Sequence, residues 1–505
     1  MLKWLGGADA PEHPMANLAY VKETLATIPA EDSMRAAQDA VQWLESIETE
    51  NHFSLMHRYE VVDLIDAALK RHGQRLLDQY LALKPQAKFQ EGLLWRTTTG
   101  YWKALGDAYL VCVTQATSDK NVASAFRKKI PQVVARAMRA QVLQIKWILM
   151  RYGYVGDSNW STVVQLYEQA QSGGYLDDVI DIYGGAHGKG TIRQEFLRTL
   201  MLGVSSTGGL SPVKQNFAER AIAYFSSAFI SSTSPTAGCN FFFDLNGGMA
   251  PARVLANAPS DARLFYFGAG QALDHAQHAV DVVNDTGALP PEFALNAGVT
   301  IDEAADTFLH LAFNWEKELP ARDSERRKIA TTLQVTHGFD GVLSAADNGL
   351  QETWVVENAS IEGYGMIVPE RRGEWLQVGV LLGLLPESEM PKWGAGIVRR
   401  VETDALGQRR VGIQIISRAI SPATMCTSQL TGERGEPHHV VLLDAKPSRS
   451  GYMQALLRPE SFTLRDALEA TRTADGQSFM MMPSGMVESG PDFDRVRFKV
   501  EGAES

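Results

Sequence analysis

Two short motifs hold the residues whose types and spacing favour ligand binding. They provide arginines and small polar residues: Arg322, Arg326 and Arg327 in the first, and Asn358, Ser360 and Gly363 in the second. An arginine guanidinium presents a planar fork of N–H donors, which pairs with anions and also stacks on rings. Asn358 and Ser360 lie two positions apart, so on a strand they would share one face. The motifs therefore predict a binding site for a small anion.

A glycine-rich segment and a pair of histidines are weaker candidates. The segment 184–191, GGAHGKGT, invites comparison with a phosphate-binding loop, but its spacing differs and Gly stands where Ser or Thr must bind magnesium. His275 and His278, with Asp274 and Asp281 nearby, lie on one expected helix, where a metal could bind. The sequence offers no evident second pair of ligands, so a solvated polar helix face is the simpler interpretation. We predict no metal site.

The first half of the chain has the hydrophobic periodicity of helices. Apolar residues recur every three or four positions, for example from Leu55 to Leu69. The segment 161–172 resembles one helix of a helical hairpin, although no fixed repeat length emerges. We expect a repeat-like helical module over 31–230, preceded by a loosely ordered N-terminus over 1–30.

The second half changes from mixed structure to strands. Residues 231–320 combine short strands with helices, the last of which we expect to run to Leu319 and to stop at Pro320. From there on, short alternating apolar runs are separated by Gly, Pro, Asn and Asp, which is typical of a small barrel or sandwich. We expect a small antiparallel β-barrel over 321–420 and a β-rich extension over 421–505. The fold class is therefore multidomain α + β.

The segment from about residue 321 to 420 resembles the PilZ family. Members of that family that bind a ligand pair an RxxxR motif with a [D/N]xSxxG motif about thirty residues later, and here the order and spacing agree. The runs that follow, at 376–384, 393–400 and 411–413, resemble the later strands of the PilZ barrel. The resemblance covers about a fifth of the chain and does not extend to the helical half.

The resemblance implies a non-catalytic receptor for cyclic di-GMP, with its site at Arg322, Arg326, Arg327, Asn358, Ser360 and Gly363. Two arginines four residues apart can hold both phosphates of that dinucleotide, and the polar pair can meet a guanine edge. The helical module would then relay binding to an unidentified protein partner, with no cofactor needed. A ligand-free PilZ-like adaptor is the alternative, and a metal-dependent hydrolase is a weaker one.

The composition agrees with a regulatory protein of the cytoplasm. The formal net charge is −11, which disfavours binding to nucleic acid polymers. The three cysteines lie far apart and show no metal-type pairing, as expected of isolated thiols in a reducing compartment. The sequence shows neither a signal peptide nor an apolar run long enough to span a membrane.

Overall fold

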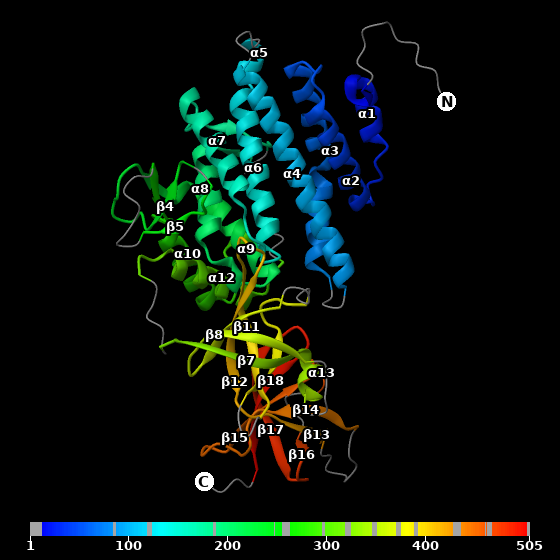
Figure 1. Cartoon of the computed structure of the whole chain (residues 1–505), viewed down its shortest axis with the longest axis vertical. Helices are drawn as coiled ribbons and strands as arrows, with labels where there is room; N and C mark the ends of the chain where they lie inside the picture. Colours follow the sequence, from blue (N-terminus) through cyan, green and yellow to red (C-terminus); the bar gives the residue numbers. More distant parts are fainter. Residues whose placement is uncertain are drawn as a thin grey trace. The chain divides into compact units, whose positions relative to one another are not determined.

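The computed structural model describes residues 13–83, 87–118, 124–184, 188–246, 248–254, 263–294, 298–318, 325–345, 351–369, 375–387, 392–427, 436–459, 461 and 467–501 (Figure 1). The chain divides into two compact units. The first comprises residues 1–151, 155–207 and 212–320, and the second comprises 152–154, 208–211 and 321–505. Each unit is described by itself below.

The first unit is mainly helical, with long helices lying side by side (Figure 1). Its helices are α1 (Leu18–Ala26), α2 (Ser33–Thr49), α3 (Leu55–Leu81), α4 (Lys88–Ser118), α5 (Ser124–Arg127), α6 (Ile130–Leu149), α7 (Asp157–Gly173), α8 (Ile192–Val204), α9 (Pro212–Tyr224), α10 (Ala272–Thr286), α11 (Pro291–Ala294) and α12 (Ile301–Trp315). Helix α6 is central because it packs against α4, α7, α8 and α9. Capping boxes at Thr191 and Thr300 satisfy the first N–H groups of α8 and α12.

Two small sheets complete the first unit. Strands β1 (Ile180–Asp181) and β2 (Lys189–Gly190) form a short antiparallel pair. A four-stranded sheet has the order β3 (Ile230–Ser232), β6 (Leu264–Gly268), β4 (Phe241–Asp244) and β5 (Ala252–Arg253). Alternate phenylalanines of β4 and β6 are buried, and Phe243 and Phe265 pack against aromatic rings of α7 and α8.

The second unit begins with a closed, antiparallel six-stranded barrel. Its strands are β7 (Arg327–His337), β8 (Glu352–Ala359), β9 (Gly363–Ile367), β10 (Leu381–Pro386), β11 (Gly394–Thr403) and β12 (Arg409–Ser417), with helix α13 (Gly338–Leu343) after β7. Around the barrel the order is β7-β8-β9-β12-β11-β10. Inward side chains alternate along the strands, as with Leu333 and Val335, and enclose the indole of Trp354.

A second closed barrel follows. Its strands are β13 (Ser421–Thr427), β14 (His438–Leu442), β15 (Tyr452–Leu457), β16 (Leu468–Arg472), β17 (Ser478–Ser489) and β18 (Asp494–Val500). Their order, β13-β14-β15-β18-β17-β16, repeats the connectivity of the first barrel strand for strand. One buried apolar cluster contains residues of both barrels, among them Ile397 and Val441, so the two barrels share part of their core.

The turn between the second and third strands also recurs. It reads Ser360-Ile-Glu-Gly-Tyr364 in the first barrel and Ser448-Arg-Ser-Gly-Tyr452 in the second. In each turn the serine hydroxyl accepts a backbone N–H, from Glu362 at 3.3 Å and from Tyr452 at 3.1 Å. The C-terminal β segment is therefore a second copy of the same barrel topology.

The expected fold class is confirmed, while two element boundaries are wrong. The strand expected over 376–384 begins only at Leu381, because a turn with Gly379 at φ 92° interrupts it. The helix expected to reach Leu319 ends at Trp315, since Glu316 adopts an extended backbone with ψ 156°. Leu319 and Pro320 lie outside the described residues.

Candidate functional site

A cavity of about 480 Å³ opens on the first barrel, bordered by β8, β9, β11 and β12 and by Arg326 just before β7. It is lined by Arg326, Glu357, Asn358, Ser360, Glu362, Gly363, Gly365, Arg399, Arg400, Glu402, Arg410, Val411, Gly412, Ile413 and Gln414. The structure thus brings four of the six site residues expected from the sequence into one cavity. A volume of this size suits a small organic ligand.

Arg326 and Asn358 face each other across the start of the barrel. The guanidinium of Arg326 donates to Oδ1 of Asn358 at 3.3 Å. Asn358 pairs with Gly365 of β9, and its amide fills the space that a side chain there would take: a Cβ on Gly365 would lie 2.6 Å from the Asn358 Nδ2. The absence of a side chain at Gly365 therefore lets the Asn358 amide lie over β9.

Ser360 and Gly363 shape the turn that borders the cavity. The Ser360 N–H donates to the carbonyl of Gly363 at 2.8 Å, and the Ser360 hydroxyl accepts the N–H of Glu362. A Cβ on Gly363 would lie 2.2 Å from the carbonyl oxygen of Ile413. Gly363 is thus required by the close approach of β9 to β12.

Of the other two arginines expected at the site, only Arg327 lies among the described residues. Arg327 is the first residue of β7 and is exposed, but it is not among the residues that line the cavity. Strand alternation explains this, because adjacent side chains point to opposite faces. Arg322 lies outside the described residues.

Three further arginines at the cavity were not selected from the sequence: Arg399 and Arg400 on β11, and Arg410 on β12. Only the three-dimensional pairing of β9, β12 and β11 brings them beside Asn358. The segment 393–400, WGAGIVRR, which resembles a later strand of the PilZ barrel, ends in two adjacent arginines. That pattern is the signal that could have identified two of the three.

Each of these arginines already contacts a carboxylate. Arg399 donates to Glu488 of β17 at 2.8 Å, and Arg400 donates to Glu402 at 2.8 Å. Arg410 donates to Asp404 at 3.0 Å. Since these pairs are partly exposed, their net contribution to stability is small, on the order of 0–1 kcal/mol each. An incoming phosphate can therefore exchange for a carboxylate at little cost.

The arrangement can bind an anion that also carries a hydrogen-bonding ring. Four arginines and three glutamates line the described part of the cavity, and Glu488 and Asp404 outside the lining pair with two of these arginines. Guanidinium groups bind phosphate in a bidentate manner and stack on flat rings. The Asn358 amide offers both a donor and an acceptor to a base edge.

The histidine pair and the glycine-rich segment are the two weaker candidate sites from the sequence. His275 and His278 line a cavity of about 600 Å³ together with aromatic and proline side chains. Across the described ranges, no three His, Cys, Asp or Glu side chains gather as they would around a metal ion. The glycine-rich segment forms the β1–β2 connection, of which residues 185–187 are outside the described part. Among the described helices, none combines the length and the apolar character needed to cross a membrane.

Comparison with known proteins adds one finding. Residues 19–233 match the family model described as "Cyclic-di-GMP receptor FimW, N-terminal domain". The match lies in the helical half and covers less than half of the chain. The chain matches no curated protein. Since the matched region ends before the first barrel, the PilZ-like character of residues 321–420 stays a prediction.

Proposed function

We propose that the chain is a regulatory receptor that binds cyclic di-GMP in the cavity of the first barrel. The observation that carries the proposal is the convergence of Arg326 with Asn358 and Ser360 in one cavity, next to further arginines. These residues belong to the two motifs that resemble the PilZ family. The match of residues 19–233 to a cyclic-di-GMP receptor family supports the same ligand.

The chemistry of the ligand suits this wall. Cyclic di-GMP carries two phosphates and two guanines, so it needs several cations and at least one group that reads a base edge. Arg326 and the arginines of β11 and β12 would pair with the phosphates and stack on the guanines. Asn358 would hydrogen-bond a guanine edge, while Ser360 and Gly363 would hold the turn in place.

Arg399 offers a route from ligand binding to the second barrel. Its guanidinium lines the cavity and also pairs with Glu488 of β17. A ligand phosphate that takes this guanidinium would release Glu488 and loosen one contact between the barrels. Ligand binding would then weaken the contact between the two barrels, which is a local electrostatic switch.

The receptor would be non-catalytic and cytoplasmic, and its helical module would bind the protein partner that receives the signal. Helical arrays commonly present extended surfaces for such partners.

Calorimetric titration of the full chain with cyclic di-GMP tests the proposal. We expect binding that weakens as salt rises, because the contacts are made to phosphates. Cyclic di-AMP serves as the matched control: it keeps the phosphates but changes the base edge, so it should bind at least about tenfold more weakly. Absence of heat with cyclic di-GMP at low and moderate salt would refute the proposal.

A ligand-free adaptor is the second candidate function. The observation that favours it is that Arg399, Arg400 and Arg410 are already paired with carboxylates, as in a structural ion-pair network. In that case the barrels would act only through protein contacts, and the titration above would show no binding.

A further inference from the structure

Two short segments from the helical half of the chain belong to the unit that contains the barrels. Residues 152–154 lie between α6 and α7, and residues 208–211 lie between α8 and α9. Tyr152 is part of the apolar core of the first barrel and is only 5% exposed. A Cβ on Gly208 would lie 2.5 Å from the carbonyl oxygen of Val401 on β11. Both segments therefore pack directly against the first barrel.

Hydrogen bonds hold Tyr152 in this position. Its hydroxyl donates to the carbonyl of Leu210 at 3.1 Å and accepts the N–H of Val378 at 3.1 Å. The hydroxyl of Thr403, the last residue of β11, donates to the Tyr152 carbonyl at 2.5 Å. Tyr152 thus links the two segments to each other and to the end of β11.

Tyr152 also has a strained backbone. Within the described ranges, the non-glycine residues with φ in the left-handed region are Tyr152, at 56°, and Ser206, at 50° and two positions before the second segment. A bulky residue adopts this conformation only where surrounding contacts over-determine it. For Tyr152 those contacts include the hydrogen bonds from Thr403 and Val378. Weaker contacts would therefore let the connection between α6 and α7 relax.

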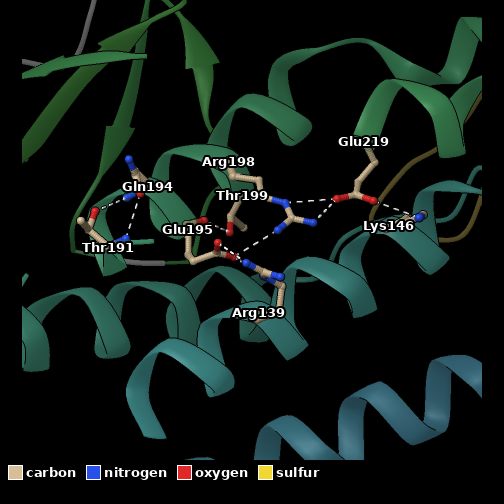
Figure 2. A network of polar contacts seen from close by, with 8 residues as sticks. All are labelled: Arg139, Lys146, Thr191, Gln194, Glu195, Arg198, Thr199 and Glu219. Atoms are coloured by element: carbon tan, nitrogen blue, oxygen red, sulfur yellow. Dashed lines mark hydrogen bonds and ion pairs between the residues drawn. The ribbon is translucent and has the colours of Figure 1, made fainter. Parts of the chain in front are cut away.

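Three helices next to the two segments, α6, α8 and α9, are joined by buried charges (Figure 2). Glu219 of α9 accepts hydrogen bonds from Lys146 of α6 at 2.9 Å and from Arg198 of α8 at 3.1 Å. Glu195 of α8 accepts two from Arg139 of α6 at 2.5 Å. The side chains of Arg198, Glu195 and Glu219 are each less than one tenth exposed, so separating these pairs is costly. The three helices, called here the α6–α8–α9 group, should therefore move together.

Strand β11 connects the candidate ligand cavity to the contacts of Tyr152. Arg399 and Arg400 both line the cavity although they are adjacent, because the register of β11 against β12 shifts between Val398 and Arg400. Val401 and Thr403, which meet the two segments, follow Arg400 by one and three positions. A ligand that binds both arginines would therefore also hold the end of the strand.

We propose that the first barrel controls the α6–α8–α9 group through Tyr152: a ligand bound to Arg399 and Arg400 fixes the end of β11 and thereby the left-handed Tyr152. The inference rests on the proposed function, since it needs a ligand in the cavity of the first barrel. It is distinct from the contact with Glu488, which leads to the second barrel. With the ligand bound, the end of α6 and the connection between α8 and α9 open less often.

Amide hydrogen exchange of the full chain, measured by mass spectrometry with and without cyclic di-GMP, tests the inference. The ligand should slow exchange over residues 148–156 and 204–212 by at least about threefold, because these segments then open only if a held strand releases them. Helix α1, which packs against α3, should exchange equally in both states. Calorimetry distinguishes the two failures: binding heat without slower exchange would overturn this inference alone, whereas no binding heat would overturn the proposed function and this inference with it.

Three variants test the role of Tyr152. Thr403→Val removes the donor to the Tyr152 carbonyl, and Tyr152→Phe removes the hydroxyl but keeps the ring in the core. Both should bind cyclic di-GMP within about threefold of the wild type, since neither residue lines the cavity, but both should lose most of the slowing of exchange. Thr471→Val is the matched control, because it removes a strand hydroxyl that pairs with Ser478 in the second barrel. Full slowing in both Tyr152→Phe and Thr403→Val, or an equal loss in Thr471→Val, would refute the route through Tyr152.

Discussion

Arg399 of β11 donates two hydrogen bonds to the carboxylate of Glu488 on β17, so a side chain of the candidate ligand cavity is held by the other barrel. The same guanidinium donates through Nε to Gln414 of β12 at 2.8 Å. Gln414 of the cavity wall therefore helps to position the Arg399 guanidinium, while Glu488, outside that wall, balances its charge.

Replacing Glu488 tests whether this pair opposes ligand binding. Glu488→Gln keeps the shape of the side chain but removes its charge, which frees Arg399 to pair with a phosphate. We expect cyclic di-GMP to bind about three- to tenfold more tightly, corresponding to about 0.7–1.4 kcal/mol. Calorimetry at low salt measures the difference.

Glu501→Gln is the control for this experiment. It removes an exposed carboxylate from the end of the second barrel and changes the net charge by the same amount. Unchanged affinity in this variant together with tighter binding in Glu488→Gln assigns the effect to the Arg399 pair. Weaker binding in Glu488→Gln would contradict the exchange of phosphate for carboxylate.

Arg326 and Arg327 provide a comparison between neighbours. Arg326 lines the cavity and contacts Asn358, whereas Arg327 starts β7 and is not among the lining residues. Arg326→Ala should weaken cyclic di-GMP by roughly ten- to a hundredfold, the cost of about 1.5–3 kcal/mol for a charge-assisted contact. Calorimetry on both variants measures the contrast.

The neighbouring variants supply the controls. Arg327→Ala should change affinity less than about threefold, through long-range charge alone. Arg322→Ala should have a smaller effect than Arg326→Ala, because Arg322 precedes the start of β7 by five positions along the chain and Arg326 by one. Similar losses in Arg326→Ala and Arg327→Ala would show that only the overall charge matters.

The sequence predicted the parts of the site that lie close together along the chain. Arg326, Asn358, Ser360 and Gly363 belong to two short motifs, one just before β7 and one at the end of β8, and the resemblance of these motifs to the PilZ family was enough to select them. Arg399 and Arg410 reach the cavity only through the pairing of β11 and β12 with β9. Strand order is a long-range property, and periodicity within one strand does not specify it.

The fold shows the same division between local and long-range information. Helix stripes and alternating strands were enough to assign the α + β class. The second barrel was expected only as an extension, because most of its strands are short. Its equivalence to the first barrel becomes visible in the strand order and in the SxxGY turns at Ser360 and Ser448.

Gly363 is predicted to be essential for the first barrel. A Cβ there would lie 2.2 Å from a backbone carbonyl of β12, which cannot move aside without disturbing the strand pair. Gly363→Ala should destabilise the barrel by about 1–3 kcal/mol, as overpacking does. Gly485→Ala on β17 is the control, since nothing lies within 4 Å of the added methyl. Urea unfolding followed by tryptophan fluorescence compares them, and equal stabilities would contradict the close approach of β9 to β12.

The last prediction concerns the buried carboxylate of Glu219 in the helical unit. Burial by itself would raise its pKa, but Lys146 and Arg198 outweigh burial and hold that pKa well below its ordinary value of 4.5. A carboxyl whose pKa is depressed in the folded state stabilises the fold at neutral pH, and this stability is lost as pH falls below about 4.5. Glu219→Gln leaves Lys146 without its carboxylate and Arg198 with Glu195 alone, and should cost about 3–5 kcal/mol at pH 7. The loss should be slightly smaller at pH 4, where the carboxyl begins to be protonated in the unfolded chain while it stays ionised in the folded one. Glu168→Gln, which breaks the more exposed pair with Arg263, should cost about 1 kcal/mol or less at either pH. Thermal unfolding followed by far-ultraviolet circular dichroism measures these differences, because that signal reports the helices. A Glu219→Gln protein as stable as Glu168→Gln at pH 7 would show that the buried network contributes nothing to the fold.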